Sequence, residues 1–281
     1  MAEESLDRWI KVGGIKTHYL TNGDGEPVIL LHGGALGVSA RENWHRNLGP
    51  LANGGYSVYA PEIVGSGETD KPAGCHTIAA KIRHIEDFID ALCLEKVFLV
   101  GNALGASLAL ALAHHQPNRV RAVVVMGGPG APHGRASTSL NRLTAIANAY
   151  TREGIRESLR TLCSDQSLIT DEIVERRFRL AQLPGAREAF SAFISSPDGG
   201  PSMWDRVQGL LPEIRQPVLL IWGEEDRILP LELARKLLPQ LPNARLEIID
   251  NCGHWAQIEC PETFNRLVLE FFEPLRGRER P

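Results

Sequence analysis

Short apolar runs alternate along the chain with longer segments in which apolar residues recur every three or four positions. Each short run has the length of a strand buried on both faces; these runs are Val28–Leu31, Tyr56–Ala60, Val97–Val100, Ala122–Met126, Val218–Trp222 and Leu246–Ile249. The longer segments have the spacing of helices with one apolar face; they are Ile78–Leu94, Ala106–His114, Leu231–Leu238 and Pro261–Phe272. Strands that alternate with helices predict an α/β protein with a mostly parallel, doubly wound sheet.

The start of the chain departs from this alternation. Arg8–Val12 and Ile15–Leu20 lie on either side of Gly13 and Gly14. A glycine pair readily adopts the positive φ angles of a tight hairpin turn. We therefore expect the chain to open with an antiparallel hairpin.

The strand pattern disappears from about Gly130 to about Asp205. Helix-like segments replace it; they are Leu140–Tyr150, Gly154–Cys163 and Asp171–Gln182. Short stretches rich in Pro and Gly flank the region and have the composition of hinges; they are Gly127–Gly134 and Ser196–Ser202. We predict a core made of residues 1–129 and 206–281, with a helical cap, residues 130–205, inserted between its strands.

Composition and charge narrow the class of partner. The 281 residues are 43% hydrophobic and carry a formal net charge of −4, which suits one core of ordinary size. No long run of Lys or Arg indicates nucleic acid or an anionic membrane surface, and no apolar run approaches the ~20 residues of a membrane-spanning helix. We expect a small-molecule ligand, with no nucleic-acid or membrane partner.

The first residues and the cysteines indicate where in the cell the protein is expected and whether it holds disulfides or a metal. Residues 1–7 lack the basic and apolar blocks of a signal peptide, so we expect a cytoplasmic protein. The cysteines form an odd set without paired Cys-x-x-Cys spacing, which disfavours a disulfide framework or a zinc site. We expect no metal, and buried thiols at Cys75, Cys93, Cys163, Cys252 and Cys260.

A buried strand, a glycine-bounded turn and a helix are predicted to meet near residue 103. The run Val97–Val100 leads into Gly101-Asn102-Ala103-Leu104-Gly105. This is the pattern of a nucleophile elbow, Gly-x-Ser-x-Gly, with alanine in place of serine. The two glycines suit a strained turn in which strand and helix pack closely. A tight turn without function is the alternative, and the buried strand before it favours the elbow.

Two further residues lie at the ends of later strands. Asp226 follows the run that ends at Trp222, and His254 lies in the loop after the last strand. Their order along the chain, after Ala103, is that of nucleophile, acid and base in this fold. A surface aspartate and a core histidine are the ordinary alternatives, but two such residues in these positions favour a catalytic triad.

A glycine-rich loop, His32-Gly33-Gly34-Ala35, directly follows the first buried run. Its glycines can direct backbone N–H groups into the site, and we predict an oxyanion hole made by the N–H groups of Gly34 and Leu104. We expect His32 to be a structural hydrogen-bonding residue, because His254 already fills the role of the base.

With these residues the sequence resembles the meta-cleavage product hydrolases, which are carbon–carbon bond hydrolases of aromatic-ring degradation. That family typically carries Gly-Asn-Ser-x-Gly at the elbow and Cys-Gly-His-Trp at the base. This chain has Gly101-Asn-Ala-Leu-Gly105 and Cys252-Gly-His-Trp255. The cap segment Asp165–Glu172, followed by Arg177, is similar too, and the resemblance covers nearly the whole chain.

The resemblance implies a set of substrate-binding residues beside Gly33. Asn43 and Asn102 match asparagines that hold the dienoate end of the substrate, and Trp255 matches a pocket wall. Arg177 matches a cap arginine that pairs with the carboxylate or enol oxygens, a task that suits a bidentate guanidinium. Judged by its local sequence alone, Arg177 would instead be a solvated helix residue.

Two positions depart from the family pattern. The loop usually reads His-Gly-x-Gly-Pro-Gly, whereas this chain has His32-Gly-Gly-Ala-Leu-Gly37, which implies a methyl group and a bulkier side chain at the rim of the pocket. Glu62 stands where many α/β-hydrolases have aspartate, and we interpret it as a residue that organises its loop.

Alanine at the nucleophile position has a direct chemical consequence. A methyl group cannot attack a carbonyl, so the chain as written cannot form an acyl-enzyme; Ser107, one helical turn further on, does not replace the serine. Either serine was deliberately changed to Ala103, or a native protein has lost its nucleophile. The retained acid, base and oxyanion loop favour the first, although a proton-transfer protein that uses His254 would keep the same pair.

For the serine form, the resemblance implies hydrolysis of a 2-hydroxy-6-oxohexa-2,4-dienoate to 2-hydroxypenta-2,4-dienoate and a carboxylic acid. It implies no cofactor and a homo-oligomer, a dimer or larger. With Ala103 we expect binding, with turnover lower by ~10³-fold or more. An ester or lactone hydrolase of the same fold, or a native-alanine ligand-binding or proton-transfer protein, is the alternative. Arg177 and Asn43 distinguish the dienoate hydrolase from an ester hydrolase, since a neutral ester needs neither residue.

Overall fold

One mixed sheet organises the molecule. The computed structural model describes residues 7–128, 150–196 and 202–277. The sheet has eight strands in the order β1-β2-β4-β3-β5-β6-β7-β8. The strands are β1 (Asp7–Val12), β2 (Ile15–Asn22), β3 (Glu26–Leu31), β4 (Tyr56–Pro61), β5 (Val97–Asn102), β6 (Val120–Met126), β7 (Val218–Gly223) and β8 (Ala244–Ile249).

The strand directions confirm the predicted α/β class and the N-terminal hairpin. Strands β3 to β8 are parallel, whereas β2 is antiparallel to both β1 and β4. Each predicted strand agrees with the observed one to within two residues at either end.

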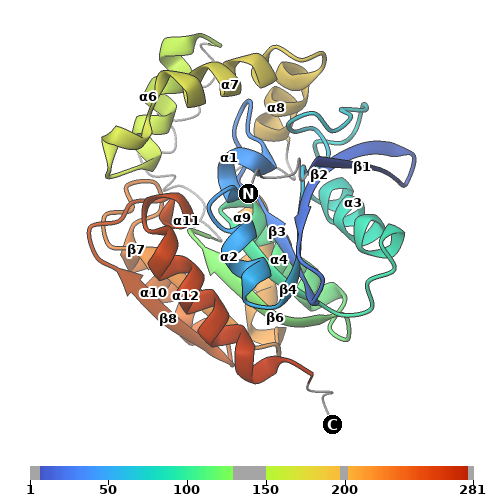
Figure 1. The fold of residues 1–281 in the computed structure, drawn as a ribbon, viewed down its shortest axis with the longest axis vertical. Coiled ribbons are helices and arrows are strands. Elements are labelled where there is room, and N and C mark those ends of the chain that lie inside the picture. The colour runs from blue at the N-terminus through green and yellow to red at the C-terminus, as the bar shows by residue number, and fades with distance from the viewer. Residues whose placement is uncertain (1–6, 129–149, 197–201, 278–281) are drawn as a thin grey trace.

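Helices cover both faces of the sheet (Figure 1). The α-helices are α1 (Ala40–Trp44), α2 (Leu48–Asn53), α3 (Ile78–Ala91), α4 (Leu104–His115), α6 (Arg152–Leu162), α7 (Asp171–Ala181), α8 (Ala186–Ser195), α9 (Ser202–Leu210), α10 (Leu231–Leu237), α11 (Ala256–Glu259) and α12 (Pro261–Phe272). Short 3-10 helices are η1 (Gln166–Leu168), η2 (Leu211–Glu213), η3 (Leu238–Gln240) and η4 (Glu273–Leu275).

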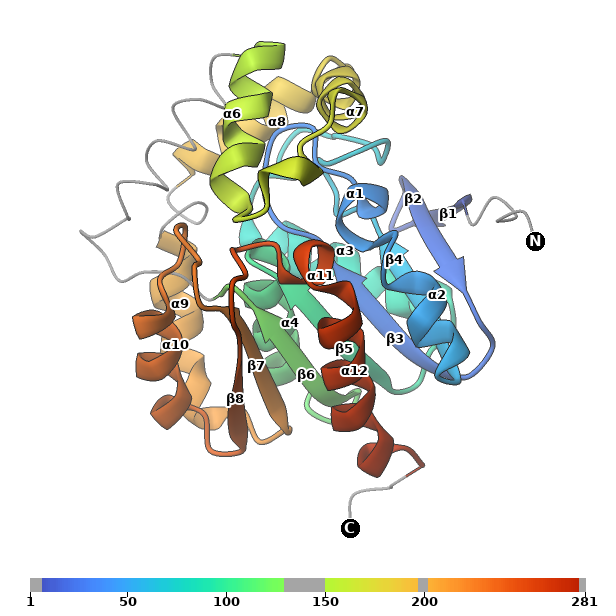
Figure 2. The same cartoon turned by 60° about the vertical axis from the view of Figure 1, so that its left-hand side comes forward.

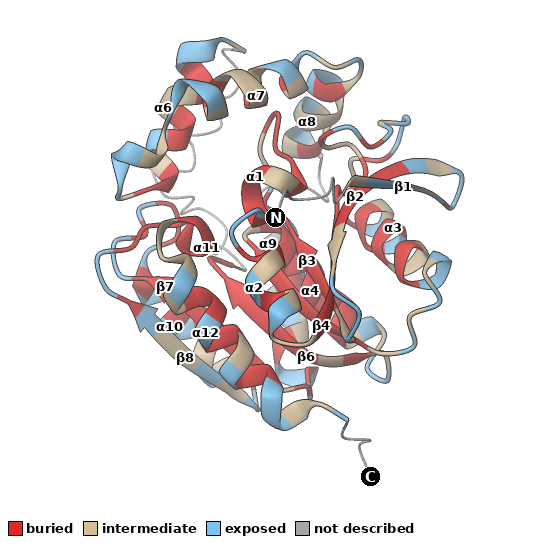
Figure 3. Ribbon diagram, in the orientation of Figure 1, coloured by how far each residue is buried: buried red, intermediate tan, exposed pale blue. Residues whose placement is uncertain are grey.

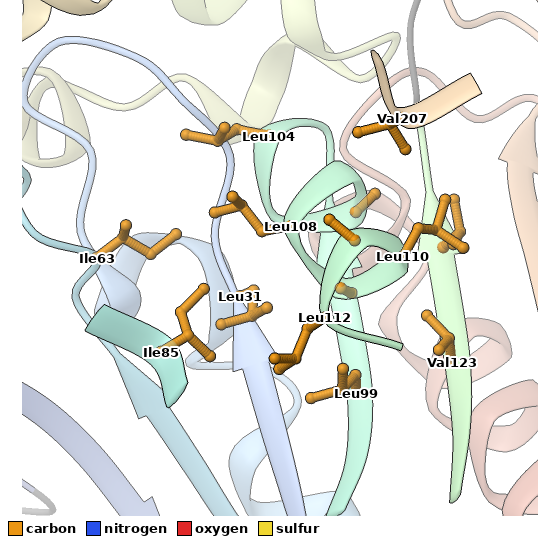
Figure 4. Close-up of a cluster of buried hydrophobic side chains, with 14 of the residues drawn as sticks. Leu31, Ile63, Ile85, Leu99, Leu104, Leu108, Leu110, Leu112, Val123 and Val207 are labelled. Atoms are coloured by element: carbon orange, nitrogen blue, oxygen red, sulfur yellow. The ribbon is translucent and has the colours of Figure 1, made fainter. Parts of the chain in front are cut away.

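The apolar strand runs supply two cores, because successive side chains of a strand point to opposite faces. Leu31 and Leu99 belong to a cluster with residues of α3 and α4, and Figure 4 shows them beside Leu108 and Leu112 of α4. Leu30 belongs to a second cluster with residues of α2 and α12. The central strands are accordingly buried (Figure 3). Each fully buried leucine contributes on the order of 2 kcal/mol through burial, so the layers hold the loops at the strand ends in place.

Helices α6, α7 and α8 lie together beyond the carboxyl ends of the parallel strands (Figure 2). The division into core residues 1–129 and 206–281 and cap residues 130–205 stays a prediction. The predicted helix Leu140–Tyr150 lies outside the described residues except for Tyr150, as does most of both predicted hinges. Helix α9 runs across the second predicted boundary.

The cysteines follow the prediction in part. All five are free thiols, and Cys75, Cys163 and Cys252 are buried. The prediction of a buried thiol is wrong for Cys93, which is exposed because it lies in the surface turn after α3, and Cys260 is only half-buried. Among the described helices, none has the length and apolar character needed to cross a membrane.

Candidate active site

Ala103 lies at the junction of β5 and α4. It is the N-cap residue of α4, with φ 49° and ψ −105°, a conformation that non-glycine residues rarely adopt. Its N–H donates to the carbonyl oxygen of Met126 at 2.9 Å. The sharp reversal directs residue 103 away from the strand, and Ala103 is more exposed than its neighbours Asn102 and Leu104.

The two elbow glycines have a steric reason. A Cβ at Gly101 would lie 2.3 Å from the carbonyl oxygen of Gly105, and a Cβ at Gly105 would lie 2.1 Å from that of Leu31. Any side chain would therefore push the helix away from the strand. Ser107 is buried in α4 and its hydroxyl donates to the carbonyl oxygen of Ala103 at 3.4 Å, so it points back along the helix, as expected.

Asp226 and His254 form a buried pair. The loop after β7 presents Asp226, and the loop after β8 presents His254; the two residues are 5% and 4% exposed. Nδ1 of His254 donates to Oδ2 of Asp226 at 2.7 Å. The other carboxylate oxygen accepts the N–H groups of Ile228 and Leu229, each at 2.8 Å. These bonds fix the carboxylate and leave Nε2 of His254 free of Asp226.

The His254 ring is held by its surroundings as well. Gly127, just after β6, has φ +57°, and a Cβ there would lie 2.5 Å from Cε1 of the ring. The backbone N–H of His254 donates to the carbonyl oxygen of Leu162, the last residue of α6, at 2.9 Å. Gly127 was predicted to belong to a hinge; its contact with His254 is what the sequence did not reveal.

The loop after β3 packs directly against the elbow. A Cβ at Gly33 would lie 2.8 Å from Oδ1 of Asn102, and a Cβ at Gly34 would lie 3.0 Å from the Leu104 side chain. Leu104 is the first residue of α4, where backbone N–H groups lack intrahelical acceptors. The two N–H groups predicted to form the oxyanion hole thus belong to neighbouring segments.

His32 has the structural role that the sequence predicted. Its Nε2 accepts the N–H of Ile63 at 2.9 Å, and its Nδ1 donates to the carbonyl oxygen of Gly33 at 2.7 Å. Burial lowers the pKa of His32 to about 4, so the ring is neutral and can accept. Glu62 organises its loop, because its carboxylate accepts the N–H of Glu68 at 2.6 Å.

Asn43 connects the loop after β3 to the loop after β8. Its Oδ1 accepts the N–H of Gly33 and Nε1–H of Trp255, both at 3.4 Å. Its Nδ2 donates to the carbonyl oxygen of Ser39 at 3.0 Å. Nδ2 of Asn102 donates to the carbonyl oxygen of Met126 at 3.5 Å. Both asparagines and Trp255 are buried; Asn102 directly precedes Ala103, and Trp255 directly follows His254.

Arg177 reaches the same region from α7. It is 2% exposed, so the alternative of a solvated helix residue is wrong. Its guanidinium lies 5.5 Å from the centre of the Trp255 ring. Its Nε donates to Oε2 of Glu42 at 3.1 Å, a buried partner that the sequence did not reveal.

Glu259 of α11 is a second residue that sequence reasoning missed. One carboxylate oxygen accepts the N–H groups of Gly253 and Trp255, on either side of His254, at 3.0 and 3.3 Å. The other accepts those of Ser164 and Asp165, after α6, at 2.7 and 3.2 Å. This carboxylate therefore joins the loop that carries His254 to the segment that follows α6.

A small cavity lies next to the oxyanion loop. Gly34 and Leu104 line one side, and Phe190 and Phe193 of α8 line another. Lys81 of α3 lines it as well, and burial lowers the pKa of this ammonium group to about 8. Within the described ranges, no group of three or more His, Cys, Asp or Glu side chains has the arrangement of a metal site.

Comparison with known proteins gives a consistent result. The family described as alpha/beta hydrolase fold matches residues 26–261. The 2-hydroxy-6-oxo-2,4-heptadienoate hydrolase of Pseudomonas putida is 34% identical over 273 residues, which cover 95% of this chain and 96% of that protein. The 2-hydroxy-6-oxo-6-phenylhexa-2,4-dienoate hydrolase of Burkholderia cepacia is 35% identical over 286 residues, covering 96% and 98%.

A solved structure is similar to the same extent. It is a serine-to-alanine mutant of the meta-cleavage product hydrolase of Pseudomonas fluorescens IP01, complexed with acetates. The TM-score is 0.86 at 36% identity, and the match covers 95% of this chain and 97% of that one. The similarity therefore extends over nearly the full length of each chain.

Proposed function

The chain belongs to the α/β-hydrolase fold family and, within it, to the meta-cleavage product hydrolases, and from this membership we propose that its serine form hydrolyses a carbon–carbon bond of 2-hydroxy-6-oxo-dienoates. The observation that carries the proposal is the buried Asp226–His254 pair, with its 2.7 Å hydrogen bond, beside an elbow at residue 103. The products are 2-hydroxypenta-2,4-dienoate and a carboxylic acid.

The chemistry assigns a task to each residue. Because Nδ1 of His254 is bonded to Asp226, Nε2 is the nitrogen that exchanges protons. His254 assists conversion of the dienol to its keto form, which creates an electron sink for the bond that breaks. A serine at 103 then attacks the distal ketone, and the N–H groups of Gly34 and Leu104 stabilise the oxyanion, by about 3 kcal/mol per donor.

We assign the dienoate end to the buried polar side chains near the elbow. Asn43, Asn102 and Trp255 would contact it, and Arg177, which lies against Trp255, would supply the positive charge for the carboxylate. Gly33 permits close approach of the loop backbone. An ester hydrolase would have no use for a buried arginine there, which is why we place this alternative second.

The distal ketone substituent is left open by this assignment. The two relatives compared above are named for a heptadienoate and for a phenylhexadienoate, substrates that differ in that substituent. The substrate class of this chain is accordingly the dienoate as such. We further propose that α6, α7 and α8 belong to a cap, residues 130–205, that covers the site, and that the protein acts as a homo-oligomer without a cofactor.

With alanine at residue 103, we expect the protein to bind the substrate without hydrolysing it. With the acid, base and binding residues in place, the protein binds the dienoate and assists its tautomerisation, but it lacks the atom that attacks. The turnover of a serine variant is expected to exceed that of the Ala103 protein by ~10³-fold or more.

The test is a spectrophotometric assay of the protein and its Ala103→Ser variant with 2-hydroxy-6-oxo-6-phenylhexa-2,4-dienoate and alkyl analogues, following loss of the dienolate absorbance. We expect the variant to consume the compound and the Ala103 protein only to bind it. A double variant, Ala103→Ser with His254→Ala, controls for background reaction. If neither the protein nor the serine variant binds these compounds, the dienoate proposal is wrong.

A further inference from the structure

Helices α1 and α7 each contribute one charged side chain to a contact that is sealed from solvent. Nε of Arg177 donates to Oε2 of Glu42 at 3.1 Å, and the two side chains are 2% and 0% exposed. Nη1 of Arg177 and Oε1 of Glu42 are also buried, yet neither has a hydrogen-bond partner among the residues that the structure describes. Buried polar atoms almost always have partners, so this pair has hydrogen-bonding capacity that the described part of the chain leaves unused.

The pair adjoins the place proposed for the dienoate carboxylate. The Arg177 guanidinium lies over the Trp255 ring. Nε1–H of Trp255 donates a hydrogen bond to Oδ1 of Asn43, the residue next to Glu42. Asn43 is bonded in turn to Gly33 of the oxyanion loop. A carboxylate that came to Arg177 would therefore share its guanidinium with Glu42.

The surroundings of Glu42 disfavour the ionised form of its carboxyl group. Burial is the largest influence and raises the pKa of Glu42 to about 7, against the opposite effects of Arg177 and Arg176 of α7. Glu62, the residue after β4, raises the pKa further. The carboxyl group is thus poised between its two states near neutral pH.

Other titratable groups on the elements that pack around α1 have partners of their own. His18 of β2 is paired with Asp7 and Glu62. His32, after β3, is neutral, because burial lowers its pKa to about 4. Glu259 of α11 accepts backbone N–H groups of the loop that carries His254. Arg177 is accordingly the direct counter-charge of Glu42.

We propose that Glu42 competes with the substrate carboxylate for Arg177, and that binding of the substrate transfers a proton from solvent to Glu42. This inference rests on the proposed function. The proton converts the Glu42 carboxylate to a carboxylic acid, no other bond changes, and Arg177 becomes available to the ligand. Two carboxylates and one guanidinium would otherwise leave a net negative charge in a region of low dielectric, where such charges are costly.

The sign of the pH dependence follows from this exchange. Above pH 7 Glu42 is mostly ionised in the free protein, so binding takes up close to one proton and affinity falls as pH rises, by up to about tenfold per unit. Below pH 7 Glu42 is mostly protonated already, so uptake is small and affinity levels off. Glu42 thereby sets the pH range in which this chain accepts an anionic substrate.

The test compares the protein with its Glu42→Gln variant, by calorimetric titration with 2-hydroxy-6-oxo-6-phenylhexa-2,4-dienoate at pH 6, 7 and 8. Titrations in phosphate and in Tris, which differ in ionisation enthalpy, give the number of protons taken up. The ionisation of the dienol itself is common to both proteins and cancels in the comparison. Glu270→Gln removes a carboxylate from an exposed pair with Arg266 on α12 and serves as the matched control.

We expect the protein and the Glu270 control to take up close to one more proton than Glu42→Gln at pH 8, and little more at pH 6. Glu42→Gln should bind about tenfold more tightly at pH 8, with a flatter pH profile. Circular dichroism checks the fold, and Glu42→Ala is the second variant if glutamine disrupts it.

Equal proton uptake in all proteins would overturn the inference about Glu42 and leave the proposed function standing. Weaker binding by Glu42→Gln at every pH would also overturn it, because Glu42 would then support the site instead of competing. Absence of binding by every protein at every pH would overturn the proposed function together with the inference.

Discussion

Three contacts hold His254 in position. Asp226 bonds to its Nδ1 at 2.7 Å, Leu162 accepts its backbone N–H, and Gly127 leaves the space that the ring fills. Proton transfer depends on distance, and a misplacement of about 1 Å is enough to cost on the order of 10²-fold in rate. Gly127 is therefore as much a part of the site as the residues that react.

We predict that Gly127→Ala, made in the Ala103→Ser background, lowers kcat by about tenfold or more, because its Cβ would displace the ring. The positive φ also costs about 1–2 kcal/mol of stability for any L-residue. Gly74→Ala is the control, since Gly74 has φ +83° but nothing within 4 Å of its Cβ position. In urea unfolding both variants should lose this conformational stability, and Gly127→Ala should lose more, because only its Cβ meets a neighbouring side chain. Equal kcat values would contradict the role of Gly127.

Single residues also mark where sequence reasoning stops. Ala103, Asp226 and His254 could be located because each follows a recognisable strand in a fixed order. Glu42 and Arg177 could not be paired in advance, since 135 positions separate them. Hydrophobic periodicity indicates which segments are helical, but it does not indicate which distant segments pack together. The same holds for Glu259, whose partners Ser164 and Asp165 are 95 and 94 positions away.

At the scale of elements, helix α3 buries one lysine next to its apolar face. Ile82, Ile85 and Phe88 pack in the core as the helical spacing predicts. Lys81 is buried beside them, where its ammonium group donates to the carbonyl oxygen of Val64 at 2.9 Å and lies 5.3 Å from the centre of the Phe193 ring. Such contacts replace only part of the hydration that a charged group loses on burial.

We predict that Lys81→Met stabilises the protein at pH 7 by up to about 3 kcal/mol. Burial lowers the pKa of Lys81 from 10.5 to about 8, so between these values the unfolded chain binds more protons than the folded one. The free energy of unfolding of the parent protein therefore rises as pH increases from about 8 to 10.5. Over this range the stability advantage of Lys81→Met should disappear.

Urea unfolding at pH 7 and at pH 10 measures this difference. Lys236→Met, on the exposed face of α10, is the control and should change stability little at either pH. A Lys81→Met protein that is less stable than the parent at both pH values would contradict the argument.

The elements themselves were the most predictable part of the structure. Buried parallel strands are near-continuous apolar runs, so β3, β5, β6 and β7 stand out in the sequence. Helix α9 shows the limit of such reasoning. It crosses the predicted cap boundary because its packing, with Val207 buried in the core cluster of α4, depends on tertiary contact and not on its local composition.

At the scale of the whole molecule, a parallel sheet brings distant segments to one edge. The loops after β3, β5, β7 and β8 carry the residues that we propose as oxyanion donors, elbow, acid and base. Segments from the region of α6 and α7 contact these loops through Leu162 and Arg177. The fold thus brings together the residues that we propose as oxyanion donors, acid and base around residue 103, with the Glu42–Arg177 pair beside them.

The central claim is that this assembly hydrolyses a carbon–carbon bond once serine stands at residue 103. The most direct measurement is product analysis by mass spectrometry, after incubation of the Ala103→Ser variant with 2-hydroxy-6-oxo-6-phenylhexa-2,4-dienoate in ¹⁸O-labelled water. The account predicts 2-hydroxypenta-2,4-dienoate and benzoate that carries ¹⁸O in its carboxylate. Recovery of the intact dienoate from a variant that binds it would contradict the account.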